Sequence, residues 1–172
     1  MSDARLREEV YDLLYAKHKP EVAVLRLNRI LEEEPENVEA LSFKAYVLNK
    51  LANATNDWKY SKSAIESSDK ALALNPVNDI ALTSKGWALI DLGKADEALP
   101  YLIRATTANS RNEYAWYNLA WAQYLTGSFS ESSTSIAKAL ELSPNNAIIR
   151  RGKQNMKSGK LPTHLRHKSA SQ

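Results

Sequence analysis

The 172-residue sequence contains no cysteine, which excludes thiol nucleophiles, thiolate metal sites and disulfide bonds. Histidine is almost as scarce: His18 stands in a predicted turn, and His164 and His167 lie in a segment without acidic residues, so a general base or a metal site lacks partners. The five glycines are isolated from one another, which excludes a glycine-rich phosphate loop. These absences predict a protein that is not an enzyme and has no cofactor, no metal site and no small-molecule substrate.

Long hydrophobic runs are also missing, since no stretch reaches the roughly 18 apolar residues that a membrane span requires. The first residues carry charges without an apolar core behind them, so we expect no secretion signal and a cytoplasmic location. With 44% hydrophobic and 25% charged residues, the chain has the composition of one globular domain.

Acidic residues are absent from the C-terminal segment. Residues 150–172 hold 7 Lys and Arg, whereas residues 1–149 hold 16 Lys and Arg against 20 Asp and Glu, so the net charge of +3 combines an acidic body with a basic end. We expect residues 161–172 to form a disordered basic tail. Such tails are most often simply solvated, and the alternative is an anchor to nucleic acid or to an anionic membrane.

A repeat marked by proline organises the rest of the chain. Pro35, Pro76 and Pro144 each follow an apolar helical pattern, and residues 110–112 occupy the corresponding place where a proline is missing. Counting back from these ends gives four units, which are residues 4–37, 38–78, 79–112 and 113–146. The period is 34 residues, and the second unit contains an insertion of seven.

Each unit contains the pattern of two helices, because apolar residues recur at three- and four-residue steps in two successive segments. Small residues recur at unit positions 8, 20 and 27, where the two helices must approach closely. Gly93 and Gly127 lie one period apart at the expected turn, where a left-handed backbone is needed. Residues 147–160 form a further polar-rich helical pattern, which predicts a helix that covers the last unit.

The fourth unit resembles the tetratricopeptide repeat family. The run AWYNLAWA at residues 115–122 and the run LELSP at residues 140–144 match the family's spacing of large, small and aromatic residues before a final proline. The resemblance covers residues 4–146 in four units. It implies an all-α protein, a right-handed α-solenoid of antiparallel helix hairpins, in one domain over residues 4–160.

The insertion in the second unit corresponds to about two helical turns, so both helices of that unit are expected to be longer while their apolar stripes stay in phase. Asp57 is the expected N-cap of the second helix. Trp58 and Tyr60 follow directly, and they either fold back onto their own repeat, which is the commoner outcome, or contact a partner.

The resemblance implies that unit positions 2, 5, 9 and 12 line a concave groove. Position 9 is Tyr46, Trp87 and Trp121 in three consecutive units, which predicts a ladder of aromatic rings, and aromatic residues are enriched at binding hot spots. For Tyr117 and Tyr124, packing against the neighbouring repeat explains the residue equally well. The predicted partner-binding residues are Tyr46, Asn49, Thr83, Trp87, Tyr114, Tyr117, Asn118, Trp121 and Tyr124.

One subclass of the family binds the acidic tails of heat-shock chaperones through Lys and Asn side chains at set positions. At those positions the first unit has Glu8 and Asp12 and the third has Thr83 and Trp87. Asn118, in the fourth unit, is the one residue that matches the subclass. The sequence therefore does not predict recognition of chaperone tails.

The function that we predict is that of a non-enzymatic adaptor, which holds a peptide or an amphipathic helix of a partner protein in an aromatic-lined concave groove. The first alternative is a scaffold that associates with further copies of itself, and the second is the basic-tail anchor. The sequence leaves open whether the chain's own C-terminal segment occupies the groove.

Overall fold

The computed structural model describes residues 3–161, and within this range the chain consists of helices joined by short turns, without a strand. The first helix continues directly into a π-helical segment, η1. The elements are α1 (Asp3–Tyr11), η1 (Asp12–Ala16), α2 (Pro20–Glu33), α3 (Val38–Thr55), α4 (Trp58–Leu74), α5 (Asp79–Asp91), α6 (Ala95–Ala108), α7 (Glu113–Leu125), α8 (Phe129–Leu142) and α9 (Ala147–Lys157).

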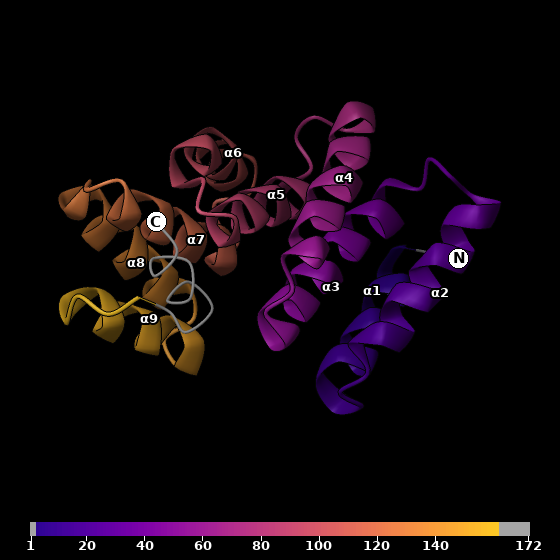
Figure 1. Cartoon of the computed structure of the whole chain (residues 1–172), viewed down its shortest axis with the longest axis horizontal. Helices are drawn as coiled ribbons and strands as arrows, with labels where there is room; N and C mark the ends of the chain where they lie inside the picture. Colours follow the sequence, from indigo (N-terminus) through magenta and orange to yellow (C-terminus); the bar gives the residue numbers. More distant parts are fainter. Residues whose placement is uncertain (1–2, 162–172) are drawn as a thin grey trace.

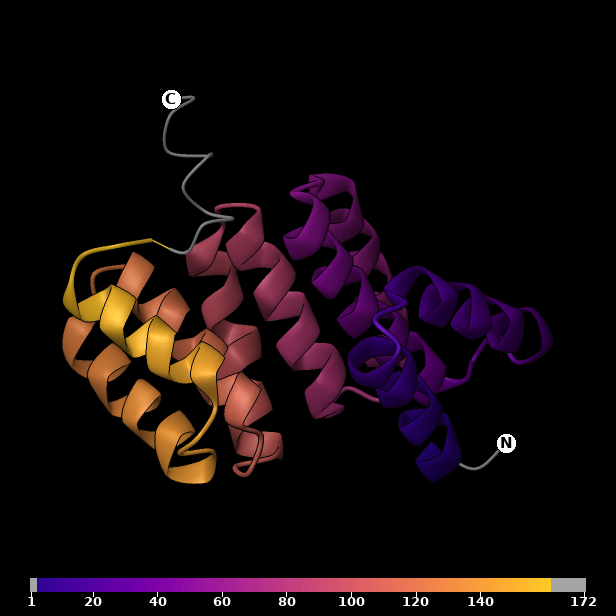
Figure 2. The same cartoon turned by 90° about the horizontal axis from the view of Figure 1, so that it is seen from below.

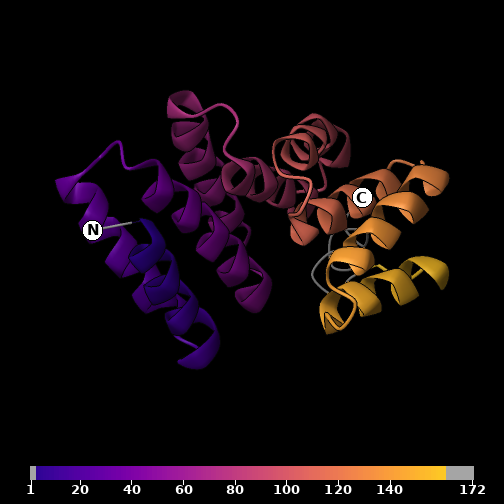
Figure 3. The same cartoon turned by 180° about the vertical axis from the view of Figure 1, so that it is seen from behind.

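The helices pack as successive antiparallel hairpins along the long axis of the molecule (Figure 1). Contacts within the hairpins join α3 to α4, α5 to α6 and α7 to α8, and the first helix of each hairpin also contacts the first helix of the next. The same order is seen from behind, where α1 and α2 lie at one end and α8 and α9 at the other (Figure 3). The predicted fold class, an all-α right-handed α-solenoid of helix hairpins, is confirmed.

The first helices of the second, third and fourth hairpins, and also α9, begin at asparagine N-caps. The side chains of Asn37 and Asn78 accept hydrogen bonds of 2.8 Å from the backbone N–H groups of Ala40 and Ala81. Asn112 and Asn146 cap α7 and α9 in the same way. Each cap is the last residue of a predicted unit, so the repeat period also sets where the next helix starts.

Close packing within the hairpins follows the small residues of the repeat. Gly86 of α5 faces the side chain of Leu102 of α6 so closely that a Cβ atom would overlap it. The turns between the helices contain Gly93 with φ of 77° and Gly127 with φ of 84°, which confirms the predicted left-handed conformation at both positions.

The insertion lengthens both helices of the second hairpin, as predicted. Helix α3 has 18 residues and α4 has 17, whereas α5 and α6 have 13 and 14. Asp57 caps α4 by accepting a 2.9 Å hydrogen bond from the backbone N–H of Lys59. Tyr60 folds back onto the core between α3 and α4, while Trp58 remains 49% exposed beneath the ammonium of Lys62.

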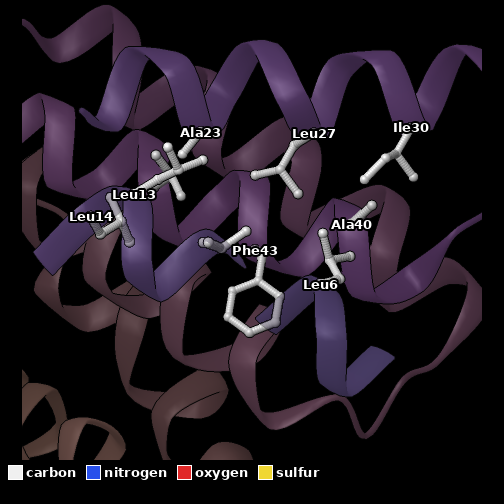
Figure 4. Packing of buried hydrophobic residues seen from close by; sticks show 10 residues of the cluster. Leu6, Leu13, Leu14, Ala23, Leu27, Ile30, Ala40 and Phe43 are labelled. Carbon is white, nitrogen blue, oxygen red and sulfur yellow. The ribbon is translucent and has the colours of Figure 1, made fainter. Parts of the chain in front are cut away.

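The first hairpin departs from the regular helical form at η1. The N–H of Lys17 donates to the carbonyl of Asp12 over 2.9 Å, which is a π-type interval of five residues, and His18 has φ of 52°. The sequence did not predict this segment. The wider turn accompanies the burial of Leu13 and Leu14 against Leu27 of α2 and Phe43 of α3, in the N-terminal core that Figure 4 shows.

Helix α9 lies along the last hairpin, beside α7 and α8, where a further repeat would otherwise follow (Figure 2). Ile149 is fully buried there, and a Cβ atom on Gly152 would lie 2.5 Å from Cε2 of Tyr117. Beyond α9 the structure describes residues 158–161, so the predicted basic tail lies outside the described residues apart from Leu161. No helix in the described part of the chain combines the length and the apolar character that crossing a membrane requires.

Candidate functional site

The most distinctive group of side chains surrounds the ammonium of Lys50. Four aromatic rings from four successive hairpins have their centroids within 5.7 Å of Lys50 Nζ. We call Lys50 and these rings the Lys50 cluster. The rings and their distances from Nζ are Tyr15 of η1 at 5.5 Å, Tyr46 of α3 at 5.4 Å, Trp87 of α5 at 5.5 Å and Tyr114 of α7 at 5.7 Å.

The repeat brings these residues together. Tyr46 and Lys50 are four residues apart on α3 and therefore share one face of that helix. Tyr46 and Trp87 occupy position 9 of adjacent units, and their rings meet edge to face with centroids 6.2 Å apart. The predicted stacking of position-9 rings is thus confirmed for this pair.

The hydroxyl groups of Tyr15 and Tyr46 are hydrogen-bonded to each other at the edge of the cluster. Burial raises the pKa of Tyr46 far above its ordinary value. Burial also raises the pKa of Tyr15, although the hydrogen bond to Tyr46 lowers that pKa in part. Both hydroxyls are therefore protonated at neutral pH. In such a pair one O–H donates to the other oxygen, so the second O–H remains available as a donor.

Lys50 is a partly buried cation that the rings stabilise. Burial lowers the pKa of its ammonium, because desolvation disfavours the charged form. Cation–π attraction opposes this penalty, with about 0.5–2 kcal/mol for each well-placed ring. Among the described residues no carboxylate lies within ion-pair distance of Lys50.

Two carboxylates at the starts of neighbouring helices, those of Glu39 on α3 and Asp79 on α5, are bonded elsewhere. Glu39 accepts a 2.9 Å hydrogen bond from Arg7, and Asp79 accepts 2.9 Å bonds from the side-chain amides of Asn109 and Asn112. Asp12, predicted to lie on the groove stripe, pairs with Lys17 at 2.6 Å. The positive charge of Lys50 is therefore not matched by these acids.

Four of the predicted partner-binding residues are buried, which corrects the prediction that they face a ligand. Asn49 is 0% exposed and donates a 2.8 Å hydrogen bond to the carbonyl of Ser84 on the next hairpin, so it joins α3 to α5. Thr83 lies beside the Asn112 cap and, like Asn118, is 6% exposed. Trp121 is 3% exposed, because α7 packs under the apolar residues of α9 and Leu161. The position-9 ladder therefore offers accessible surface at Tyr46 and Trp87 only.

The ring of Tyr117 lies against Gly152 in the apolar cluster that joins α7, α8 and α9. This outcome is the packing alternative. Tyr124 is half-buried and contacts two other rings, Trp121 at 5.7 Å and the exposed Phe129 at 5.4 Å. Of the predicted set, Tyr46, Trp87, Tyr114, Tyr117 and Tyr124 keep some accessible surface, and the first three converge on Lys50.

Sequence reasoning missed Lys50 as a site residue, and it placed Tyr15, at position 12 of the first unit, on the groove stripe without assigning it a role. The available signal was the spacing of Lys50 four residues after Tyr46, which places a cation beside the ring ladder. The convergence of rings from the first and fourth hairpins on one point depends on the curvature of the solenoid, and the repeat period alone does not specify that curvature.

Comparison with known proteins agrees with this architecture. The tetratricopeptide repeat family model matches residues 83–147. A curated relative, the small glutamine-rich tetratricopeptide repeat-containing protein 2 of Mycosarcoma maydis, is 26% identical over 109 residues, which are 63% of this chain and 31% of the relative. The chain thus spans about a third of the length of this relative.

Two solved structures share the fold. MamA from Desulfovibrio magneticus RS-1, from its residue 41 to the end, has a TM-score of 0.64 and 22% identity, with coverage of 98% of this chain and 92% of that chain. The first tetratricopeptide repeat domain of Spaghetti (RPAP3), bound to the HSP90 peptide SRMEEVD, has a TM-score of 0.55 and 23% identity. The match covers 69% of this chain and 94% of that chain. The family model over residues 83–147, the repeated hairpins and the capped helix starts confirm the predicted resemblance to the tetratricopeptide repeat family, with four hairpins followed by α9 in the described residues.

Proposed function

We propose that the protein is a non-catalytic adaptor that binds a peptide or an amphipathic helix of a partner protein at the Lys50 cluster. The observation that carries the proposal is the convergence of Tyr15, Tyr46, Trp87 and Tyr114 from four hairpins. Tyr15 is 48% exposed and the other three rings are partly exposed. Rigid aromatic side chains that gather at one place are typical of binding hot spots.

The fold supports a role in protein interactions, because stacked helical repeats present extended surfaces for partners. The structural neighbour RPAP3 was solved with a bound peptide. The Lys50 cluster differs from the site with which one subclass of the family binds chaperone tails. It is built mainly from aromatic rings and contains one lysine. We therefore assign the contact surface to the partly exposed rings rather than to the buried Asn49, Thr83, Asn118 and Trp121.

The test is selection of binders from a displayed library of random twelve-residue peptides, followed by affinity measurements on two tryptophan variants. Trp87→Ala removes a ring of the cluster, and Trp58→Ala removes an exposed ring on α4 outside it. We expect selected peptides to bind Trp87→Ala at least tenfold more weakly, because truncation of a hot-spot aromatic typically costs about 2 kcal/mol. Equal binding to wild type and to Trp87→Ala would show that the site lies elsewhere.

Self-association is the alternative use of the same rings, and light scattering separates it from peptide binding. A mass that rises with concentration in the wild type and falls in Trp87→Ala indicates that a second copy of the chain covers the cluster. A mass of one chain at every concentration is the result expected of the peptide-binding adaptor.

A further inference from the structure

We propose that Lys50 anchors a carboxylate of the bound partner, an inference that rests on the proposed function and specifies its ligand. Lys50 has ring contacts but no carboxylate partner among the described residues. Lys85 provides the internal comparison: its ammonium also lies over a ring, Tyr101 at 4.1 Å, but it pairs with Asp69. The partly buried Lys50 thus lacks the counter-ion that Lys85 has, whereas Lys62 over Trp58, which also has no ion pair within residues 3–161, is exposed to solvent.

The surroundings of Lys50 favour an anion over a neutral or cationic group. The rings lower the local polarity, so an ion pair formed there is stronger than one in bulk water. The ammonium supplies up to three N–H donors, and the Tyr15–Tyr46 pair supplies the O–H that their mutual hydrogen bond does not use. A second cation would be repelled by Lys50, and a neutral amide would gain no charge-assisted bond.

The size of the positive charge favours a carboxylate over a phosphate group. The cluster holds one lysine and no arginine, whereas phosphate sites typically use bidentate arginine or several cations. Arg7, over the ring of Phe43, is already bonded to Glu39. One ammonium with one hydroxyl donor matches the single charge and the acceptor atoms of a carboxylate.

The rings also restrict what accompanies the carboxylate. Tyr46 and Trp87 meet edge to face beside Lys50, so the neighbouring part of the ligand lies against aromatic surface. A partner segment with an acidic group next to an apolar or aromatic residue fits both features. The carboxylate belongs either to an Asp or Glu side chain or to the C-terminus of the partner, and the chemistry at Lys50 is the same for both.

Three tripeptides test the proposal by NMR titration of the full chain. Acetyl-Gly-Phe-Glu-amide carries only a side-chain carboxylate, acetyl-Gly-Gln-Phe with a free terminus carries only a terminal one, and acetyl-Gly-Phe-Gln-amide is the neutral control. We expect at least one acidic peptide to bind about tenfold more tightly than the neutral one, as charge-assisted hydrogen bonds predict. The acidic peptide that binds identifies the source of the carboxylate.

Two lysine variants locate the effect. Lys50→Met keeps the length of the side chain without the charge, and Lys85→Met is the matched control at a second partly buried, ring-bound lysine. The preference for an acidic peptide should disappear in Lys50→Met and persist in Lys85→Met. A further measurement uses the wild-type protein alone. An acidic peptide should raise the pKa of Lys50, measured by NMR at its ε-carbon resonance, while the neutral peptide leaves that pKa unchanged.

The possible failures are distinguishable from failure of the proposed function. Equal binding of all three peptides, or an acid preference that survives in Lys50→Met, overturns the carboxylate anchor and leaves the aromatic surface as a binding site. Absence of binding by both acidic peptides also overturns the anchor. The library experiment with Trp87→Ala then decides separately whether the cluster binds peptides at all.

Discussion

Gly152 shows how a single residue determines the packing of the capping helix. It lies within α9 and is buried against the ring of Tyr117 on α7. In a solvent-exposed helix, alanine is preferred over glycine by about 1 kcal/mol. At this position the preference is opposed by the ring, because a Cβ atom would lie 2.5 Å from Tyr117 Cε2.

We therefore predict that Gly152→Ala destabilises the protein by about 1–3 kcal/mol, the usual cost of overpacking, despite the better helix propensity of alanine. Chemical denaturation monitored by circular dichroism measures the difference. In a Tyr117→Ala background the same substitution should be neutral or stabilising, since the ring is gone. Stabilisation by Gly152→Ala in the wild-type background would mean that α9 does not approach Tyr117 this closely.

At the scale of single residues, the sequence predicted the type of side chain better than its environment. Tyr46 and Trp121 both stand at position 9, yet Tyr46 keeps accessible surface and Trp121 is 3% exposed. The difference arises because α9 and Leu161 cover the fourth hairpin, whereas the neighbours of Tyr46 bury its ring only in part. A position in a repeat specifies the direction of a side chain, but its exposure also depends on which elements lie opposite.

At the scale of elements, the asparagine caps both start a helix and join it to the preceding repeat. The amide oxygen of Asn112 accepts from the N–H groups of Tyr114 and Ala115, while its amide nitrogen donates to Asp79 over 2.9 Å. Asn146 caps α9 and donates to the hydroxyl of Tyr114 over 3.3 Å. In each case the amide oxygen caps one helix and the amide nitrogen bonds to the first helix of the preceding hairpin, so one side chain links the two helices.

Substitution of Asn112 should separate these two roles. Asn112→Ala removes the cap and the link to Asp79 and should lower stability by about 1–3 kcal/mol. Asn112→Ser retains a good N-cap and loses only the link, so we expect a smaller loss, about 1 kcal/mol. Thermal unfolding of both variants gives the comparison, and equal losses would contradict a separate contribution from the cap.

Helix positions were largely predictable because turns, caps and apolar stripes repeat with the same period. The longer helices of the second hairpin followed from the seven extra residues, and Asp57 capped the second of them as expected. The π-helical segment Asp12–Ala16 was not predictable, because it depends on the tertiary burial of Leu13 and Leu14. The Lys50 cluster was only partly predictable, because residues far apart in sequence meet there.

At the scale of the whole molecule, α9 takes the place of a further repeat and covers the last hairpin. Ile149 is fully buried and Met156 packs with Tyr117 and Ile136 in the same cluster. Removal of α9 would expose this apolar surface to water. Terminal helices with a polar outer face are the usual means by which repeat arrays remain soluble.

A chain that ends at residue 145 should therefore be less stable than one that ends at residue 161, by about 3 kcal/mol or more for the loss of the buried Ile149 and the partly buried Met156. Its mass should also rise with concentration in light scattering, because the exposed surface associates. The chain that ends at 161 keeps α9 and serves as the control. If the shorter chain were as stable as the control and stayed monomeric, α9 would not be the cap of the solenoid.

The Lys50 cluster also bears on the cooperativity of folding. In an ideal repeat array each unit contacts only its neighbours, so the end units fray independently of the rest. Here Tyr15 of the first hairpin and Tyr114 of the fourth share one ammonium on the second. This coupling extends beyond adjacent units, so opening of either end disrupts the same cluster. The four hairpins are thereby expected to exchange their protected amide hydrogens as one unit rather than progressively from the ends.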